Sequence, residues 1–139
     1  MLMLATGEVA RISWYDFHND GTNPAYNEHN FGLIHNENYN YAPKPGAVAY
    51  RVMVEELAGQ EFKELSRSDS GVYVARFSDS GEDVFVAWTT GEERDIWLDG
   101  GTARVRDLMG NWSKAAGSVK IGESPVYIEG EGISLSVDQ

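Results

Sequence analysis

The second half of this sequence alternates apolar and polar residues with a period of two, and glycine-rich turns interrupt the alternation at short intervals. At the end of the chain, Ile133, Leu135 and Val137 are expected to face inward, whereas Ser134 and Ser136 face outward. A period of two is typical of strands that bury one face. Eight strands are expected, at residues 61–65, 72–77, 83–88, 95–98, 102–107, 119–121, 126–128 and 133–137.

Many short strands separated by turn signals are typical of two sheets packed face to face. The residues from 78 to 82 predict a hairpin between two of the strands, and Asp99-Gly100-Gly101 predicts another turn. The fold is therefore predicted to be mainly β, with an antiparallel β-sandwich over residues 60–139.

The first 59 residues have a different pattern. Residues 11–17 form a nearly continuous apolar and aromatic run, which is typical of a strand buried on both faces. A polar loop with all three histidines follows, up to Lys44. Loops of this length are usually functional or disordered, and the five aromatic residues at positions 17–41 argue against disorder.

Residues 45–58 predict an amphipathic helix that begins at Pro45 and is closed by Gly59. Its buried face is expected to include Tyr50, Val54 and Leu57. The sequence thus divides into a strand–loop–helix segment, residues 1–59, and a β-sandwich domain, residues 60–139.

Three stretches of the first segment resemble the end of a clan-A glycoside hydrolase barrel, most closely of the family 39 kind. They are residues 7–21 with Trp-Tyr-Asp-Phe and Asp-Gly, residues 28–33 ending in Gly-Leu, and residues 44–50 beginning Lys-Pro. In that family this pattern closes a (β/α)8 barrel, and a C-terminal β-sandwich follows. Residues 105–111 and 124–128 are similar to strand segments of that sandwich. The resemblance implies a C-terminal fragment or accessory domain of an enzyme that hydrolyses O-glycosidic bonds.

The same resemblance implies that the chain is not catalytic alone. The two catalytic glutamates of the family lie on the fourth and seventh barrel strands, upstream of the matched segment. The acidic pairs at residues 55–56, 61 and 64, and 92–93 are close in sequence, so their side chains are not expected to flank a bond as glycoside hydrolysis requires. No catalytic residue is assigned, and whether the chain is an enzyme stays open.

The resemblance suggests substrate-side roles for Trp14, Asp16 and Asp20 in the intact enzyme, with the indole as a platform for a sugar ring. The alternative is that Trp14 belongs to a core and Asp16 caps a turn. Trp97 and Trp112 lie near turns and are candidates for a carbohydrate-binding surface on the sandwich, although such residues more often pack at an edge. Two rival functions follow: a stand-alone carbohydrate-binding module, and a structural or interaction domain without a ligand.

Composition limits the classes of partner that the chain is expected to bind. The formal net charge of −11 disfavours nucleic acid, whose phosphates require lysine and arginine. There is no cysteine, and the spacing of His18, His29 and His35 matches no zinc signature, so neither a metal nor another cofactor is expected. The apolar start, residues 1–5, is too short to span a membrane and has no basic region of a signal peptide. The compartment stays undetermined.

An exposed strand offers unpaired backbone groups to other chains. The helix over residues 45–58 can cover only one face of the strand over residues 10–17, so this segment must either pack on the chain's own β-sandwich or pair with a second copy. We expect a homo-oligomer through these two elements, and a monomer would indicate the first alternative.

Overall fold

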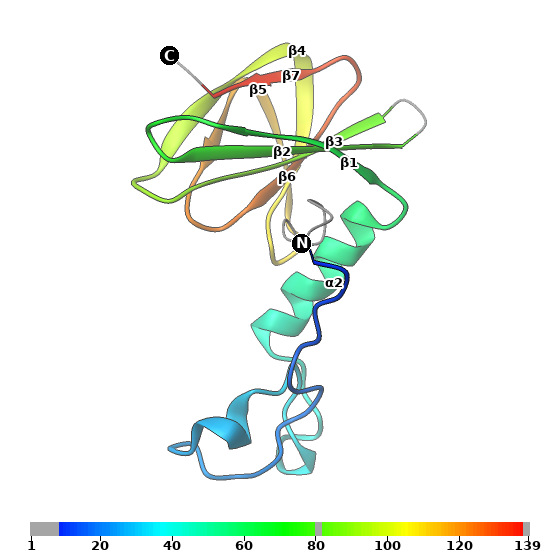
Figure 1. The fold of residues 1–139 in the computed structure, drawn as a ribbon, viewed down its shortest axis with the longest axis vertical. Coiled ribbons are helices and arrows are strands. Elements are labelled where there is room, and N and C mark those ends of the chain that lie inside the picture. The colour runs from blue at the N-terminus through cyan, green and yellow to red at the C-terminus, as the bar shows by residue number, and fades with distance from the viewer. Residues whose placement is uncertain (1–8, 80–81, 138–139) are drawn as a thin grey trace.

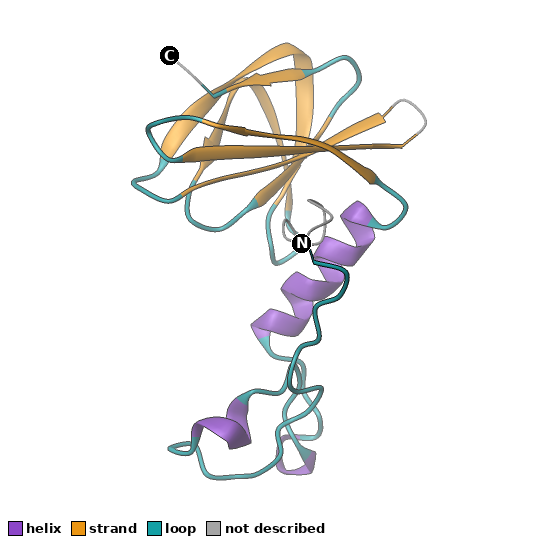
Figure 2. Cartoon of the chain, in the orientation of Figure 1, coloured by secondary structure: helices purple, strands orange, loops and turns teal. Residues whose placement is uncertain are grey.

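The structure, a computed structural model, describes residues 9–79 and 82–137. A curled β-sheet, helix α2 (Pro45–Leu57) and a loop-rich region follow one another along the long axis of the molecule (Figure 1). We call residues 9–44 the N-terminal lobe. The lobe contains two short 3-10 helices, η1 (Asn27–Asn30) and η2 (Glu37–Tyr39), and is otherwise loop (Figure 2).

Seven strands pair as one antiparallel sheet in the order β1-β2-β3-β6-β4-β5, with β7 also paired to β4. They are β1 (Glu61–Arg67), β2 (Val72–Asp79), β3 (Glu82–Thr89), β4 (Arg94–Arg106), β5 (Trp112–Ile121), β6 (Val126–Glu129) and β7 (Ser134–Ser136). The prediction of a mainly β, antiparallel fold is confirmed. The strands nevertheless form a single curled sheet, whereas a sandwich of two sheets was expected.

Strand β4 explains the curl. It joins two stretches that were expected to be separate strands, because Asp99-Gly100-Gly101 forms a bulge between Leu98 and Thr102 rather than a hairpin turn. Gly100 has a φ of +94°, and a Cβ on it would lie 2.3 Å from the carbonyl oxygen of Gly132. The bulge lets one edge of β4 pair first with β7 and then with β6, so the sheet turns a corner without breaking.

The main core lies inside the curl. Inward-facing side chains from β2, β3, β4, β5 and β6 meet there, and Ile121 and Ile128 are among the most completely buried. The period of two seen in the sequence holds at Ile96 and Leu98, and again at Ala103 and Val105, which are all buried.

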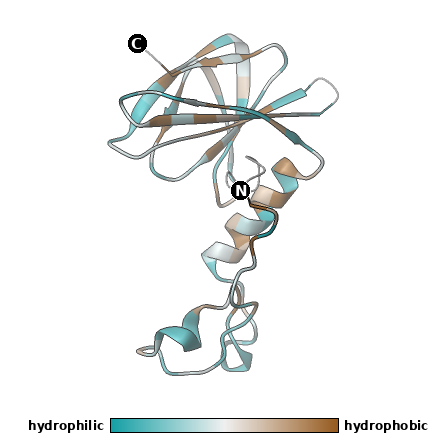
Figure 3. Ribbon diagram, viewed as in Figure 1, coloured by the Kyte–Doolittle hydropathy of each residue, from teal (hydrophilic) through white to brown (hydrophobic). Residues whose placement is uncertain are grey.

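A second core lies on the outer face of the sheet, beneath α2. Helix side chains Val52 and Leu57 pack there against apolar residues of β2, β3 and β6. Strand β3 therefore buries both faces, which accounts for its nearly continuous apolar run (Figure 3). The helix was predicted correctly, but its buried face only in part: Leu57 is buried as expected, whereas Tyr50 and Val54 are 54% and 44% exposed.

The buried stripe of α2 runs through Val52 and Glu56 because Arg106 of β4 forms an ion pair with the Glu56 carboxylate. Arg106 also pairs with Glu55 at 2.6 Å. A pattern based on apolar residues alone cannot place a glutamate on a buried face, since a charge is buried only when a partner neutralises it. The helix is therefore rotated relative to the expected orientation.

The expected buried strand over residues 11–17 is wrong. No strand is assigned there, and Trp14, Tyr15 and Phe17 are 63–68% exposed. The described part of the chain contains no helix that is long and apolar enough to cross a membrane. The domain boundary at Gly59 stays a prediction, although α2 contributes to the core of the β-sheet module.

Val52 and Val54 provide a direct test of the orientation of α2. We expect Val52→Ala to lower the free energy of unfolding by about 2 kcal/mol, because it opens a cavity in the second core. Val54→Ala, two residues away on the same helix, should change it by less than about 0.5 kcal/mol. Chemical denaturation measures both, and a larger loss for Val54→Ala would contradict the observed face.

Candidate functional site

The N-terminal lobe has no apolar core of its own. Among residues 9–44 the buried ones are Asn19, Gly32 and Asn36. Eight large apolar side chains of the lobe are exposed: Ile12, Trp14, Tyr15, Phe17, Tyr26, Phe31, Tyr39 and Tyr41. Exposed apolar side chains that cluster in one region often mark a binding surface, whereas single scattered ones are normal.

Backbone hydrogen bonds join three segments of the lobe, residues 16–19, 31–35 and 42–44, which we call its three passes. The amides of Leu33 and Ile34 donate to the carbonyl oxygens of Asp16 and Phe17, at 2.9 and 3.0 Å. On the other side of the same pass, the Lys44 amide donates to the Leu33 carbonyl at 3.0 Å. The middle pass thus fixes the first and the third.

Polar side chains take the place of a core between these passes. The Lys44 ammonium donates to Asn19 Oδ1 at 2.5 Å and to the Asn30 carbonyl at 2.7 Å. Gly32 is required where the passes meet, because a Cβ there would lie 2.3 Å from the backbone of Asn19. The lobe is consequently held by directional bonds, which need no burial of its aromatic rings.

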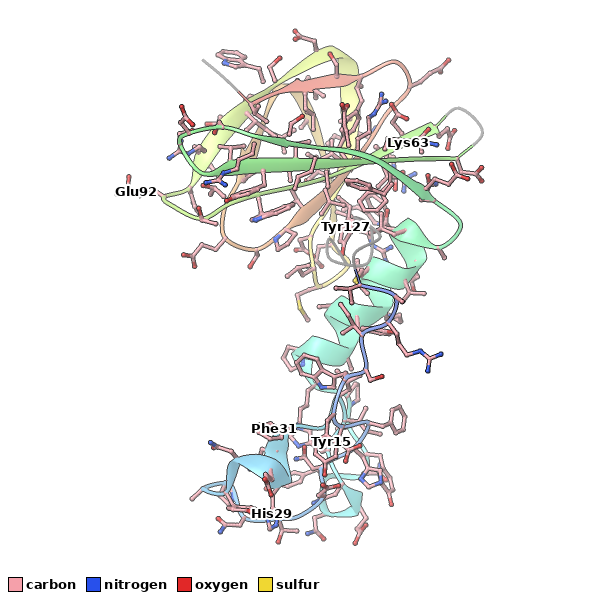
Figure 4. All side chains as sticks on the ribbon, in the orientation of Figure 1. Tyr15, His29, Phe31, Lys63, Glu92 and Tyr127 are labelled. Atoms are coloured by element: carbon pink, nitrogen blue, oxygen red, sulfur yellow. The ribbon has the colours of Figure 1, made fainter. Side chains whose placement is uncertain are left out.

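Trp14, Tyr15 and Phe31 form an aromatic cluster on this frame. The indole Nε1 of Trp14 donates to the Phe31 carbonyl oxygen at 3.0 Å. The rings of Tyr15 and Phe31 meet edge to face, with centroids 6.5 Å apart (Figure 4). These contacts hold the rings in place while leaving each of them 44–65% exposed. A fixed and accessible aromatic surface suits the stacking of a sugar ring or of another apolar face.

A carboxylate completes the cluster. The Tyr15 hydroxyl donates a short hydrogen bond to Asp20 Oδ2. This hydrogen bond and the adjacent negative charge raise the pKa of Tyr15 to about 12, and the same bond lowers the pKa of Asp20. Asp20 therefore stays ionised and can accept hydrogen bonds beside the aromatic rings.

The structure brings together the three substrate-side residues predicted from the sequence. Trp14 and the Asp16 amide both donate to the Phe31 carbonyl, and Asp20 is joined through Tyr15. One oxygen of the Asp16 carboxylate is occupied by the amide of the next residue. Tyr15 and Phe31 were missed as site residues. Both lie within the stretches that carried the resemblance, but only the folded backbone shows that they meet.

The two tryptophans predicted on the β-sheet module share the outer face of the β4–β5 hairpin. Trp97 pairs with Ser118 and Trp112 with Arg106, so about six residues of β5, roughly 20 Å, separate them. The guanidinium carbons of Arg104 and Arg106 lie 4.1 and 5.1 Å from the centroid of the Trp112 ring. Trp112 is thus engaged by cations, whereas Trp97 is 51% exposed and is the freer platform.

The three histidines do not converge. His29 packs against the ring of Tyr26 and His35 against that of Tyr39, with centroids 4.8 and 5.0 Å apart. Within residues 9–79 and 82–137, no group of three histidine, aspartate or glutamate side chains is arranged to hold a metal ion.

One pair of carboxyl groups comes together that the sequence did not reveal. Glu56 of α2 lies beside Glu129 of β6, and burial, followed by a hydrogen bond with Glu56 and then by its charge, raises the pKa of Glu129 to about 7. Arg104 opposes this rise through an ion pair with Glu129 at 3.6 Å. A cavity of about 250 Å³ opens beside Glu129. Glu56 is buried behind Arg106, so this pair does not flank an open space as two hydrolytic carboxylates would.

Comparison with known proteins assigns no family. No family model and no curated protein matches the sequence. A targeted domain of a protein of unknown function from Vibrio parahaemolyticus is similar in structure, with 20% identity over 54% of this chain and 93% of that chain. The TM-score is 0.25, and at that value the likeness assigns neither a fold nor a function.

The bond between Tyr15 and Asp20 can be tested by titration. In Asp20→Asn the pKa of Tyr15 should fall from about 12 toward the ordinary value near 10, because the negative acceptor is lost. Ultraviolet absorbance of tyrosinate measures this change against the unaltered protein. A Tyr39→Phe background removes one exposed tyrosine as a control, and an unchanged high-pH titration in Asp20→Asn would contradict the contact.

The raised pKa of Glu129 predicts how the stability of the fold depends on pH. Because its folded pKa of about 7 lies above the ordinary 4.5, its contribution to stability is complete below pH 4.5 and is lost as pH rises through 7. Glu129→Gln should therefore flatten the fall in Tm between these values. Glu131→Gln makes the same charge change beside the same cavity and should leave the slope in place. If Tm changed with pH equally steeply in the unaltered protein and in Glu129→Gln, the prediction would be wrong.

Proposed function

We propose that this chain is a non-catalytic, C-terminal portion of a family 39-like glycoside hydrolase, in which the lobe contacts carbohydrate and the β-sheet module is an accessory domain. The three stretches that carry the resemblance overlap the three passes that hydrogen-bond to one another in the lobe. Trp14, Leu33 and Lys44 each belong to one of these stretches. Their convergence is what a shared local structure requires, so it supports the proposal.

The observation that carries the carbohydrate role is the fixed, exposed cluster of Trp14, Tyr15 and Phe31 beside the ionised Asp20. A pyranose presents C–H groups on its faces and hydroxyl groups at its edge. Aromatic rings match the faces, and a carboxylate accepts hydrogen bonds from the edge. The Lys44 ammonium already donates to Asn19 and to the Asn30 carbonyl, so it stabilises the frame and leaves recognition to the cluster.

A second candidate is a stand-alone carbohydrate-binding module that uses the β-sheet. The exposed indole of Trp97 on the bare outer face of β4 favours it. A domain that only mediates assembly is the third candidate, and the exposed apolar residues of the lobe are compatible with it.

Glycan-array binding followed by fluorescence titration separates these candidates. We expect oligosaccharide binding that Trp14→Ala weakens at least tenfold, about 1.4 kcal/mol, because the stacking surface is removed. Trp97→Ala is the matched control and should bind as the unaltered protein does. The reverse result would favour the module on the β-sheet, and no binding to any glycan would favour an assembly domain.

Hydrolysis is tested separately. The proposal expects no turnover of nitrophenyl glycosides, because the resemblance assigns no catalytic glutamate to this chain, although Glu129 and Glu131 line one cavity of about 250 Å³. Release of nitrophenol above the rate of buffer alone, abolished by Glu129→Gln, would show instead that the chain is catalytic by itself.

A further inference from the structure

The start of the lobe contains a stretch of backbone that has no hydrogen-bond partner among the described residues. Residues 11–15 form an open trace leading into the lobe (Figure 1). None of their backbone groups bonds to another described residue, and the first backbone bond of this stretch is made by Asp16. Unpaired donors and acceptors in a row offer a template for another strand.

The side chains of this stretch are apolar and nearly uncharged. Ile12, Trp14 and Tyr15 are 47–65% exposed, and Arg11 is the one charged residue among them. The open edge strand β1 differs, because Glu61, Lys63, Glu64 and Arg67 protect it with charge. Residues 11–15 are therefore better suited to pairing than the edge strand β1.

We propose that a second copy of this chain covers residues 11–15 by antiparallel pairing about a two-fold axis at Ser13. In this register Ile12 of each copy stands opposite Trp14 of the other, and Arg11 opposite Tyr15. Both are favourable cross-strand pairs, one apolar and one between a cation and a ring. A two-fold axis requires a self-complementary surface, and this sequence provides it around Ser13.

The chemistry of the stretch favours a second copy over other occupants. A sugar can cover the rings, but it cannot satisfy a row of backbone donors and acceptors. A basic partner would gain from the net charge of −11, yet the stretch itself contains no carboxylate to attract it. The five residues carry one positive charge and no negative one, which partly offsets the carboxylates of Asp16 and Asp20 beside them when two acidic chains approach each other.

The available area fits a weak dimer. Trp14 and Tyr15, the two aromatic residues of the paired stretch, are 65% and 63% exposed. At roughly 150–250 Å² per aromatic side chain, they leave about 400–650 Å² for burial between two copies, which is in the range of weak, transient contacts below about 1,000 Å².

This inference does not rest on the proposed function. Trp14 belongs to both surfaces, however, so a saccharide and a second copy are expected to compete for it. Oligomeric state is measured without a sugar, and therefore failure of one proposal is distinguishable from failure of the other.

The first experiment is light scattering on the purified chain from about 1 to 100 µM. We expect a monomer–dimer equilibrium that tightens as salt is raised, because screening reduces the repulsion between two acidic chains. Ile12→Glu should raise the dissociation constant at least tenfold by placing a carboxylate against each indole. Leu65→Glu makes the same change at an exposed position of β1 and should have no effect.

Disulfide trapping tests the register. The chain contains no cysteine, so Ser13→Cys introduces a single thiol, on the proposed axis, about 4.5–5.5 Å from its symmetry mate between Cα atoms. That separation permits a disulfide. Tyr15→Cys would place its two thiols roughly 13 Å apart along the strands, which is too far.

Rapid dimer formation by oxidised Ser13→Cys, with little from Tyr15→Cys, supports the proposal. A monomer at 100 µM together with equal crosslinking of both variants would overturn it. Loss of the dimer in Leu65→Glu would also overturn it, since β1 would then be the interface. A dimer that weakens as salt rises would likewise contradict an uncharged interface.

Discussion

The ion pair between Arg106 and Glu56 is the interaction on which the arrangement of the whole molecule depends. Arg106 extends from β4 to α2, bonds both Glu55 and Glu56, and lies over the ring of Trp112. A buried ion pair is weak evidence for net stability, because desolvation offsets much of the attraction. Its orienting effect is stronger. Leaving Glu56 buried without Arg106 is costly, so only one rotation of α2 about its axis is acceptable. Because the lobe continues directly from α2, this rotation also sets the direction in which the lobe projects.

The curl of the sheet provides the other half of that junction. The bulge at Gly100 lets β4 pair with β7 and β6 in turn, and this brings Arg106 onto the same outer face as Tyr127. Tyr127 lies at the end of α2 nearest the sheet (Figure 4). A flat sheet would leave the outer face as uncovered as the inner one. Curling instead encloses the first core and leaves a convex surface that one helix can cover.

The sequence predicted what depends on local pattern. The strands at residues 72–77 and 83–88 are rich in β-branched and aromatic residues, and the helix that begins at Pro45 has both end signals; these elements are present. Prediction from the sequence failed where residues far away in the sequence determine the local structure. Asp99-Gly100-Gly101 has the composition of a turn, yet β7 and β6 hold it in a continuous strand. Glu56 is buried because of Arg106, fifty residues away. Trp14 and Asp16 were selected as site residues from a resemblance, and Phe31 could not be joined to them until the fold placed its carbonyl between them.

The run at residues 11–17 shows why composition misled. Aromatic and β-branched residues stabilise a strand only when neighbouring strands pair with it and cover its side chains. Here the described chain pairs with Asp16 and Phe17 alone and leaves the aromatic side chains exposed. The lobe is ordered by Lys44, Asn19 and backbone bonds, so its rings are left free for contacts outside the chain. Burying one such ring is worth roughly 1.5–3 kcal/mol, and ordering a lobe without an apolar core costs conformational entropy that few of its own contacts offset. A sugar, a barrel or a second copy would each contribute the missing burial. They differ in whether they can form hydrogen bonds with the backbone of residues 11–15. A paired strand can do so along the whole stretch and a sugar cannot, so this pairing distinguishes the alternatives.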